Sequence, residues 1–378
     1  MKNITILGST GSVGTQTLEV VKNFGGEFNI LGLAAGENTS LLQEQILEFN
    51  ADYFHCNRSI SEDPNFATIL KHELSLLEMA EDPNLDLLVT ATSGTIAIEP
   101  TLKAIESGTN IALANKETIV VAGQLVTQAA KKENVSILPL DSEPNAIWQC
   151  LEGETSAVKK LIITASGGSI RDVPINKLSD ITPHEALNHP NWKMGSKITI
   201  DSATMMNKVF EIIEAHYLFN VPFENIEVVI HPQSIVHSLV EFEDGSIKAV
   251  LSAPDMRIPI QYALLYPTRM FNYSTPKLEL TKLRNLDFYE PDYSRYPCLR
   301  MALEVAKLGN SWPAALTGAD DAAVSLFLNG EIGFMEIPII IEESLKHHAP
   351  TNQPTLHELI SASEISKNHT RQIIGDTQ

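Results

Sequence analysis

The first 140 residues alternate short apolar runs with stretches of helical periodicity. The apolar runs have the length of strands and lie at residues 4–7, 30–34, 85–90, 111–114 and 135–140. Apolar residues recur at three- and four-residue spacing at 15–23, 41–49, 98–107 and 117–132. Strands that alternate with helices predict a mostly parallel sheet with helices on both faces, which binds ligands at the carboxyl ends of its strands.

The pattern changes after residue 140. Polar, glycine-rich stretches at 166–169 and 189–195 separate the elements, a helical run covers 203–219, and strand-like runs follow at 227–231, 234–242 and 247–251. Residues 243–246, with the sequence Glu-Asp-Gly-Ser, have the composition of a hairpin turn between the last two runs. Residues 141–266 are therefore expected to form an α+β domain with a partly antiparallel sheet.

The last third of the chain is predicted to be helical. Residues 267–296 contain Pro267, Pro276 and Pro291 and are interpreted as a linker. Helical runs at 298–308, 320–328, 337–347 and 356–363 indicate a small bundle over 297–378. The predicted fold class is α/β, with a Rossmann-like dinucleotide-binding domain at 1–140, the α+β domain and the C-terminal bundle.

Charge and cysteine content narrow the function classes. The 378-residue chain has 27 basic and 47 acidic residues and a net charge of −20, which argues against nucleic-acid and anionic-lipid partners. Cys56, Cys150 and Cys298 have no CxxC spacing, which suits a reducing cytoplasm. No apolar stretch reaches 18 residues and no signal peptide precedes the first strand, so we expect a cytoplasmic protein without membrane spans.

Glycines at positions 8, 11 and 14 follow the first strand and precede a helix. Such a turn presents backbone N–H groups and a helix N-terminus to a phosphate, although the spacing is GxxGxxG rather than GxGxxG. The alternative is a tight strand–helix turn without a ligand. Glu37 follows the second strand near the position where an acid binds the 2′-hydroxyl of NAD, but a solvated turn glutamate explains it equally well.

Asp141 and Glu143 come directly after the fifth strand-like run. In an extended segment, residues i and i+2 point the same way, so these carboxylates would suit Mg²⁺ or Mn²⁺. The alternative is a helix start with an acidic cap and Pro144 in the first turn.

Two further segments carry candidate chemistry. Asn207, Lys208 and Glu211 recur at helical spacing, but Ser202 could simply cap an exposed helix with one Lys–Glu pair. Residues 189–195 place Trp192 and Met194 on a loop between Pro190 and Gly195, which suits a closing lid or a surface loop that tucks the tryptophan into the core.

Seven motifs occur in a specific order along the chain: GSTGSVG at 8–14, LANKE at 113–117, DSE at 141–143, ASGG at 165–168, HPNW at 189–192, DSATMMNK at 201–208 and HPQS at 231–234. Together they closely resemble the 1-deoxy-D-xylulose 5-phosphate reductoisomerase family over essentially the whole chain. The resemblance implies isomerisation of 1-deoxy-D-xylulose 5-phosphate and NADPH-dependent reduction to 2-C-methyl-D-erythritol 4-phosphate in the non-mevalonate isoprenoid pathway. It also implies a divalent metal (Mn²⁺, Mg²⁺ or Co²⁺), a homodimer and inhibition by fosmidomycin.

The resemblance also implies site residues. The metal ligands would be Asp141, Glu143 and Glu211, with Lys116 as a catalytic cation or proton donor beside them. The sugar phosphate would contact these groups and a second set: Ser142, Ser166, His189, Trp192, Met194, Ser202, Asn207 and Lys208. The lid would lie near 186–196. The cofactor contacts would be Thr10, Gly11, Ser12, Val13, Gly36, Glu37, Asn38, Asn115, Glu117 and Gly195.

Three positions depart from the family pattern. Glu37 stands where many relatives carry a basic residue, which predicts a weaker preference for NADPH over NADH. Pro144 stands where relatives often have histidine and is expected to affect the ligand turn. Residues 317–321, Thr-Gly-Ala-Asp-Asp, replace the more usual Asn-Ala-Ala-Asn-Glu, which concerns packing more than chemistry.

Two rival interpretations remain. A simple two-domain dehydrogenase would transfer hydride without a metal, so its activity would survive a chelator. A non-enzymatic nucleotide sensor would bind NADPH without turnover, and loss of Glu211 would have no measurable effect. Retention of the three carboxylates together with Lys116 and Lys208 argues against both.

Overall fold

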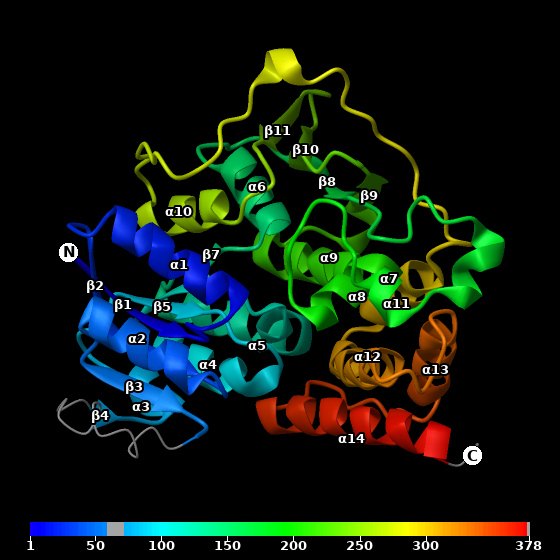
Figure 1. The fold of residues 1–378 in the computed structure, drawn as a ribbon, viewed down its shortest axis with the longest axis horizontal. Helices are drawn as coiled ribbons and strands as arrows, with labels where there is room; N and C mark the ends of the chain where they lie inside the picture. The colour runs from blue at the N-terminus through cyan, green and yellow to red at the C-terminus, as the bar shows by residue number, and fades with distance from the viewer. Residues whose placement is uncertain (59–71, 376–378) are drawn as a thin grey trace. The chain divides into compact units, whose positions relative to one another are not determined.

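The computed structural model describes residues 1–58 and 72–375, which form two compact units (Figure 1). Unit 1 comprises residues 1–118, 124–145 and 255–277, and unit 2 comprises residues 119–123, 146–254 and 278–378. Both units are therefore assembled from separate stretches of the chain. Among the described residues, no helix combines the length and the apolar composition that a membrane crossing requires.

Unit 1 is built on a parallel sheet of seven described strands in the order β4-β3-β2-β1-β5-β6-β7. From β1, the strands β2 and β3 follow towards one edge of the sheet, and β5, β6 and β7 follow towards the other edge. Right-handed crossovers from such a sheet place helices on opposite faces. The strands are β1 (Lys2–Leu7), β2 (Phe28–Ala35), β3 (Tyr53–Cys56), β4 (His72–Glu73), β5 (Leu87–Thr90), β6 (Asn110–Leu113) and β7 (Ile137–Pro139).

The helices of unit 1 follow its strands, as the alternating pattern predicted. They are α1 (Ser12–Asn23), α2 (Thr39–Phe49), α3 (Leu76–Ala80), the 3-10 helix η1 (Thr95–Ala97), α4 (Ile98–Glu106) and α5 (Lys116–Glu133), of which residues 119–123 group with unit 2. One more helix, α10 (Arg257–Leu265), comes from much later in the chain and lies beside α1 (Figure 1). The predicted α/β class with a parallel N-terminal sheet is confirmed.

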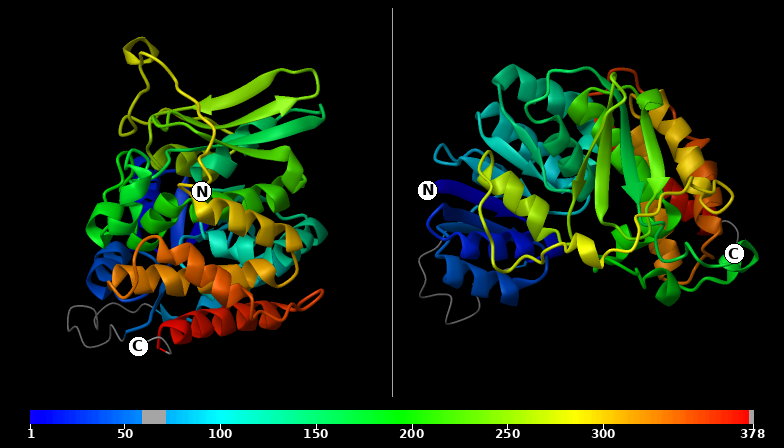
Figure 2. Two further views of the ribbon diagram at one scale, coloured as in Figure 1. Left: turned by 90° about the vertical axis from the view of Figure 1, so that its right-hand side faces the viewer. Right: turned by 90° about the horizontal axis from the view of Figure 1, so that it is seen from above.

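Unit 2 contains a mixed sheet in the order β11-β10-β8-β9, whose strands are β8 (Val158–Ala165), β9 (Ile226–Ile230), β10 (Val236–Phe242) and β11 (Ile247–Leu251). Figure 2 shows β10 and β11 as the antiparallel hairpin that the sequence predicted. Strand β8 was missed, because Lys159 and Lys160 interrupt its apolar run. These lysines form ion pairs with Glu241 and Glu227 of the neighbouring strands at 2.6 and 2.5 Å.

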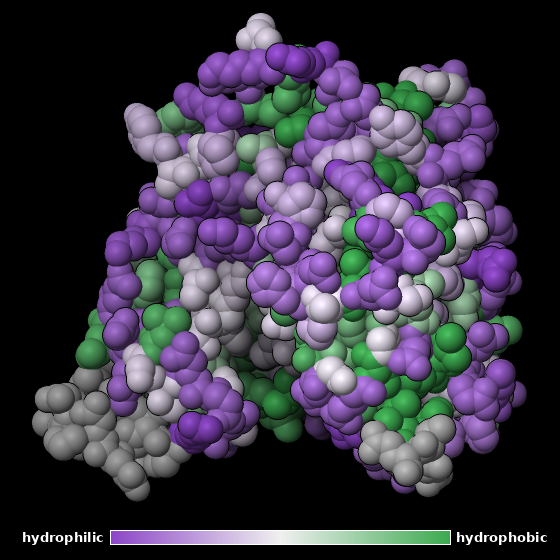
Figure 3. Space-filling model, turned by 45° about the vertical axis from the view of Figure 1, so that its right-hand side comes forward, coloured by the Kyte–Doolittle hydropathy of each residue, from purple (hydrophilic) through white to green (hydrophobic). Residues whose placement is uncertain are grey.

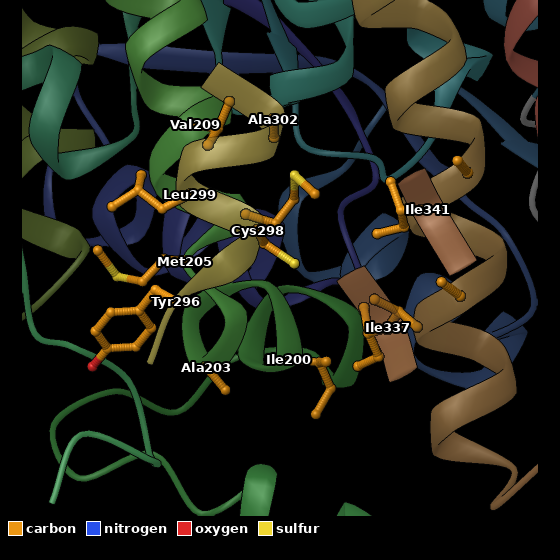
Figure 4. Close-up of a cluster of buried hydrophobic side chains, with 14 of the residues drawn as sticks. Ile200, Ala203, Met205, Val209, Tyr296, Cys298, Leu299, Ala302, Ile337 and Ile341 are labelled. Atoms are coloured by element: carbon orange, nitrogen blue, oxygen red, sulfur yellow. The ribbon is translucent and has the colours of Figure 1, made fainter. Parts of the chain in front are cut away.

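The helices of unit 2 pack around one large apolar cluster (Figure 4). Ile200, Val209, Leu299 and Ile337 of this cluster come from four different helices and are at most 1% exposed. The helices are α6 (Ser142–Leu151, whose first turn groups with unit 1), η2 (Ile175–Asp180), α7 (Pro183–Ala186), α8 (Ser196–Thr204), α9 (Met206–Phe219), η3 (Phe223–Asn225), η4 (Leu280–Lys282), α11 (Pro297–Leu308), α12 (Trp312–Leu328), α13 (Glu336–Leu345) and α14 (Leu356–Gly375).

Three predicted helices of unit 2 differ clearly in their bounds, and one of them, α14, runs to Gly375 rather than ending near 363. The single run expected at 203–219 is broken at Met205, which has a left-handed backbone (φ 64°) between α8 and α9. The pattern hid this break because the apolar residues on both sides are buried. Helix α12 begins at Trp312 rather than near 320, since residues 313–319 are all buried and show no amphipathic periodicity.

The surface agrees with the acidic, polar composition. On the face drawn in Figure 3, hydrophilic residues predominate, and hydrophobic residues form smaller groups among them. The three cysteines, Cys56, Cys150 and Cys298, are buried and free.

Candidate functional site

The glycine-rich turn after β1 is fixed by close backbone contacts. Gly8 has φ 90°, and the N–H groups of Gly8 and Ser9 both donate to the carbonyl oxygen of Ala34 at 2.9 and 2.8 Å. A Cβ at Gly14 would lie 2.2 Å from the Gly8 carbonyl oxygen. Helix α1 then starts after Gly11 without a side-chain cap. Its first N–H groups are thus suited to bind an anion, as phosphate-binding turns do.

Buried hydroxyl groups surround this turn. Ser9, Thr90 and Thr92 lie at the carboxyl ends of β1 and β5, where the strand order reverses, and their Oγ atoms have no hydrogen-bond partner in the structure. Buried polar groups normally have partners, so unsatisfied hydroxyls at a strand-order reversal mark a place where a ligand fits. The sequence analysis missed these three residues, although each lies within two positions of a strand end.

Asn115 and Glu117 were predicted to contact a cofactor, and the structure gives both a positioning role. The Asn115 side chain donates to the carbonyl oxygens of Thr92 and Gly94 at 3.0 and 2.9 Å and accepts from the Thr118 N–H at 2.9 Å. Glu117 accepts from the Gly94 N–H at 3.0 Å. Together they hold the loop that follows β5. The backbone of residues 91 and 92 in this loop lies close to Gly8 of the glycine-rich turn.

The predicted contacts after β2 lie at the same edge of the sheet. Asn38 caps α2 by accepting from the Leu41 N–H at 3.3 Å. Glu37 forms an ion pair with Arg58, which follows β3 and did not figure in the sequence analysis. Since Arg58 is distant in sequence, only the pairing of β2 with β3 reveals this contact.

Asp141 and Glu143 lie at the start of α6, where the sequence suggested an extended segment. That expectation was wrong, because the helix begins at Ser142 and the Asn145 N–H donates to the Asp141 carbonyl oxygen at 3.0 Å. Pro144 fits the first helical turn, where no intrahelical N–H bond is lost. The Ser142 hydroxyl donates to Glu143, and Asp141 is ion-paired with Lys116, the first residue of α5.

The Ser-Gly-Gly loop and the 189–195 loop meet within unit 2. Ser166 Oγ lies 2.9 Å from His189 Nε2 and accepts from the Gly168 N–H at 3.1 Å. A Cβ at Gly168 would lie 2.6 Å from the carbonyl oxygen of Ser202, so this loop also packs directly on the end of α8. Ser202 is therefore inside a helix, not at the cap that one interpretation of the sequence suggested.

The hydrogen bonds of His189 fix its tautomer. Its Nδ1 atom accepts from the N–H groups of Asn191 and Trp192 at 3.1 and 3.0 Å, which leaves the proton on Nε2. Burial, and to a smaller extent the charge of Arg171, lowers the pKa of His189 to about 4. The neutral ring therefore presents an N–H donor beside Ser166 near pH 7.

The first two turns of α9 carry three polar side chains that were expected to recur at helical spacing. Asn207 donates to Glu211 at 2.5 Å, and Lys208 forms an ion pair with the same carboxylate. Lys208 and Glu211 are 4% and 1% exposed, unlike the exposed pair of the alternative interpretation. The buried Oδ1 atom of Asn207 has no hydrogen-bond partner, which leaves an acceptor for a ligand hydroxyl.

The loop between α7 and α8 is polar and only partly packed. Trp192 and Met194 are partly exposed, and the Trp192 ring lies 6.3 Å from the ring of His237. Asn191 anchors the loop by donating to Ser234 Oγ at 2.8 Å. Gly195 caps α8 through its carbonyl oxygen, which accepts from the Thr199 N–H at 3.1 Å.

A parallel sheet with a phosphate-type turn at its strand-order reversal, joined to a second unit rich in polar side chains, defines a dinucleotide-dependent oxidoreductase. Family models for 1-deoxy-D-xylulose 5-phosphate reductoisomerase match residues 4–123, and models for C-terminal domains of the same enzyme match 137–219 and 251–369. The chain belongs to the 1-deoxy-D-xylulose 5-phosphate reductoisomerase family, as the seven sequence motifs indicated.

Relatives of this name align along the whole chain. The protein of Geobacillus kaustophilus is 48% identical, with 99% of this chain and 100% of the relative covered, and that of Desulforamulus reducens is 47% identical with 99% of each covered. The reductoisomerase of Zymomonas mobilis, solved with NADPH, is 36% identical with a TM-score of 0.89 and 99% of each chain covered. A reductoisomerase solved with NADPH, fosmidomycin and magnesium is 36% identical with a TM-score of 0.90, covering 99% of this chain and 98% of that one.

Proposed function

We propose that this protein converts 1-deoxy-D-xylulose 5-phosphate to 2-C-methyl-D-erythritol 4-phosphate, with NADPH as reductant and a divalent cation, in the non-mevalonate route to isoprenoid precursors. The observation that carries the proposal is full-length similarity to enzymes of that name together with the retained acidic and lysine side chains. The relative solved with fosmidomycin supports inhibition of this chain by the same phosphonate.

The proposed metal ligands are Asp141, Glu143 and Glu211. Three carboxylates suit a hard cation such as Mg²⁺ or Mn²⁺, so the donor set fits. A cation bound there would polarise the ketone and hydroxyl oxygens of the sugar as a Lewis acid. The lysines adjoin these ligands, since Lys116 is paired with Asp141 and Lys208 with Glu211.

The packing of α6 supports this grouping. Glu143 lies one turn before Ile147, and Ile147 packs in the same apolar cluster of unit 2 as Ile212, the neighbour of Glu211 in sequence. Both side chains are completely or almost completely buried, at 0% and 1% exposure. The part of α6 that follows Glu143 and the helix that carries Glu211 therefore contribute to the same apolar cluster of unit 2.

The proposed phosphate site consists of hydrogen-bond donors with one lysine. The neutral Nε2–H of His189 and the hydroxyls of Ser166 and Ser202 would donate to phosphate oxygens, and Asn207 and Lys208 would complete the set. Trp192 and Met194 would belong to a lid, near 186–196, that excludes water during the reduction. Ser142 would contact the sugar, and Lys116 would stabilise or protonate the reacting oxygens.

The proposed cofactor site is the carboxyl edge of the unit 1 sheet. NADPH would supply the reducing equivalents, with its phosphates on the backbone of residues 10–13 and its ribose near 36–38. Ser9, Thr90 and Thr92 fit this site because a bound nucleotide could satisfy their buried hydroxyls. Asn115, Glu117 and Gly195 would contact the nicotinamide end.

We also propose a cytoplasmic homodimer. Strand β11 is the edge of its sheet, and its apolar residues Ile247 and Leu251 are 53% and 39% exposed, as expected of a strand that a second copy covers. Three free, buried cysteines suit a reducing compartment. Sedimentation of an I247K variant as a monomer would support this dimer edge, whereas an unchanged dimer would place the contact elsewhere.

The reaction is tested by following NADPH absorbance with 1-deoxy-D-xylulose 5-phosphate, with and without Mn²⁺, for wild type, E211Q and E214Q. Glu214 is a matched control, because it lies one turn later on α9 and is equally buried at 2% exposure. We expect oxidation that requires Mn²⁺, disappears in E211Q and persists in E214Q. Activity that survives a chelator would instead indicate a simple dehydrogenase, and NADPH binding without turnover would indicate a nucleotide sensor.

A further inference from the structure

The carboxyl ends of β2 and β3 carry an ion pair whose arginine has no part in the function proposed above. The two strands are parallel neighbours, with Ala35 opposite Cys56. Glu37 and Arg58 follow these residues by two positions each, and their side chains form the pair while remaining 62% and 70% exposed. An ion pair this exposed contributes little to stability, so both side chains can rearrange to bind a ligand at low cost.

Backbone contacts hold the two strand ends side by side. The carbonyl oxygen of Gly36 accepts from the Asn57 N–H at 3.2 Å and from the Cys56 thiol at 3.1 Å. The carbonyl oxygen of Glu37 accepts from the Thr39 N–H at 3.0 Å, at the start of α2. The positions of Glu37 and Arg58 are thus set by the sheet rather than by the ion pair alone.

The location of this pair matches the place where dinucleotide-binding sheets read the adenosine ribose. An acid after the second strand accepts a hydrogen bond from the 2′-hydroxyl of NADH, and its charge repels the 2′-phosphate of NADPH. A nearby arginine accommodates that phosphate. This chain has both groups at one site. The guanidinium carries five N–H donors, so the single Nε contact with Glu37 does not saturate it.

We propose that Arg58 binds the 2′-phosphate of NADPH, and that Glu37 competes with this phosphate for the same guanidinium. The proposal rests on the function proposed above, because it assumes that the nucleotide lies on this edge of the sheet. It explains how the chain can use NADPH with an acid in the ribose position. It also assigns cofactor selectivity to two residues with opposite effects.

The test compares R58Q and E37Q with wild type. For each protein, kcat/KM is measured with NADPH and with NADH, and Kd for both nucleotides is measured by fluorescence without substrate. R58Q should lower the NADPH/NADH ratio at least about tenfold, because a charge-assisted contact with phosphate is lost. E37Q should raise the ratio, because the neutral amide competes less with the phosphate for the guanidinium and is a weaker acceptor than a carboxylate for the 2′-hydroxyl of NADH.

K22Q is the matched control. Lys22 forms a similarly exposed ion pair with Glu48, with side chains 68% and 46% exposed, away from the strand ends. This variant should leave the ratio unchanged. An R58Q ratio within about twofold of the K22Q ratio, or a shift of R58Q and E37Q in the same direction, would overturn the proposal. Wild-type protein that shows the Kd difference but no turnover would refute the proposed reaction and leave the assignment of Arg58 intact.

Discussion

Two buried aspartates in unit 2 make the stability of this protein depend on a single proton. Asp201 on α8 and Asp320 on α12 are 2% and 0% exposed, and Lys197 contacts one oxygen of each at 2.7 Å. The other oxygen of each carboxyl group is buried without a hydrogen-bond partner. Burial raises the pKa of both groups, and the neighbouring Asp320 raises that of Asp201 further. We therefore expect the folded pair to keep one proton, with which one carboxyl group can donate to the other.

The D320N substitution removes the need for this proton. An unfolded chain releases it near pH 4, whereas the folded pair retains it, so the stability of the wild type falls as the pH rises above 4. The slope for one retained proton is about −1.4 kcal/mol per pH unit. The amide introduced by D320N donates a hydrogen at any pH. Over the pH range in which the folded pair keeps its proton, the variant should therefore gain stability over the wild type, by at most about 1.4 kcal/mol per pH unit.

The assay is urea unfolding followed by tryptophan fluorescence at pH 5, 6 and 7, with D321N as control. Asp321 is the next residue on α12, and its side chain is 21% exposed and lies 3.5 Å from Lys197. D321N should change with pH much less than D320N, because Asp321 is only one of several groups that raise the pKa of the pair. If the stability difference between D320N and wild type were the same at pH 5 and pH 7, the folded pair would hold no additional proton and the reasoning would be refuted.

Three further outcomes follow from the packing and from His189. G14A should abolish NADPH binding in a fluorescence titration, because its Cβ would lie 2.2 Å from the Gly8 carbonyl oxygen, whereas G26A, with no atom within 4 Å, should bind normally. G318A should lower the free energy of unfolding, measured in urea, by about 1–3 kcal/mol, because its Cβ would lie 1.9 Å from the Ser363 carbonyl oxygen. This cost outweighs the higher helix propensity of alanine. A neutral result would mean that α12 and α14 can move apart without cost. Since the folded pKa of His189 is about 4, below its unfolded value of about 6.5, its contribution to stability is complete above pH 6.5 and lost as the pH falls towards 4. H189N should flatten that loss in pH-dependent unfolding, and an unchanged slope would mean that the ring charges freely.

The sequence predicted the parts of the fold in which apolar periodicity and burial coincide. The strands of unit 1 alternate with amphipathic helices, and the glycine-rich turn follows from local chemistry, so both could be placed from the chain alone. Strand β8 could not, because cross-strand ion pairs replace apolar residues at Lys159 and Lys160. The break at Met205 also escaped prediction, since the apolar residues on both sides of it are buried and continue the helical pattern across it.

The candidate site likewise contains features that the sequence predicted and features that only the structure shows. Motifs such as those around Asp141 and Glu211 are compact in sequence, so their chemistry can be assigned without a structure. The contact of Glu37 with Arg58 depends on which strands are neighbours, and the partnerless hydroxyls of Ser9 and Thr92 depend on which strand ends meet. Sequence pattern identifies residue types, but such contacts between distant segments require the topology of the sheet.

Helix α10 belongs to unit 1 but is synthesised after residues 146–254 of unit 2, which has a consequence for folding during translation. Ile260 and Leu264 of this helix are fully buried. Lys2 donates to the Leu264 carbonyl oxygen at 2.8 Å, so the first strand of unit 1 contacts a segment that is synthesised more than 250 residues later. A nascent chain that ends at residue 145 contains all seven described strands of the parallel sheet but not the helix that lies beside α1. During translation, residues 146–254 of unit 2 emerge before unit 1 is complete. The two units are therefore expected to mature together on the ribosome, rather than the nucleotide-binding unit folding first.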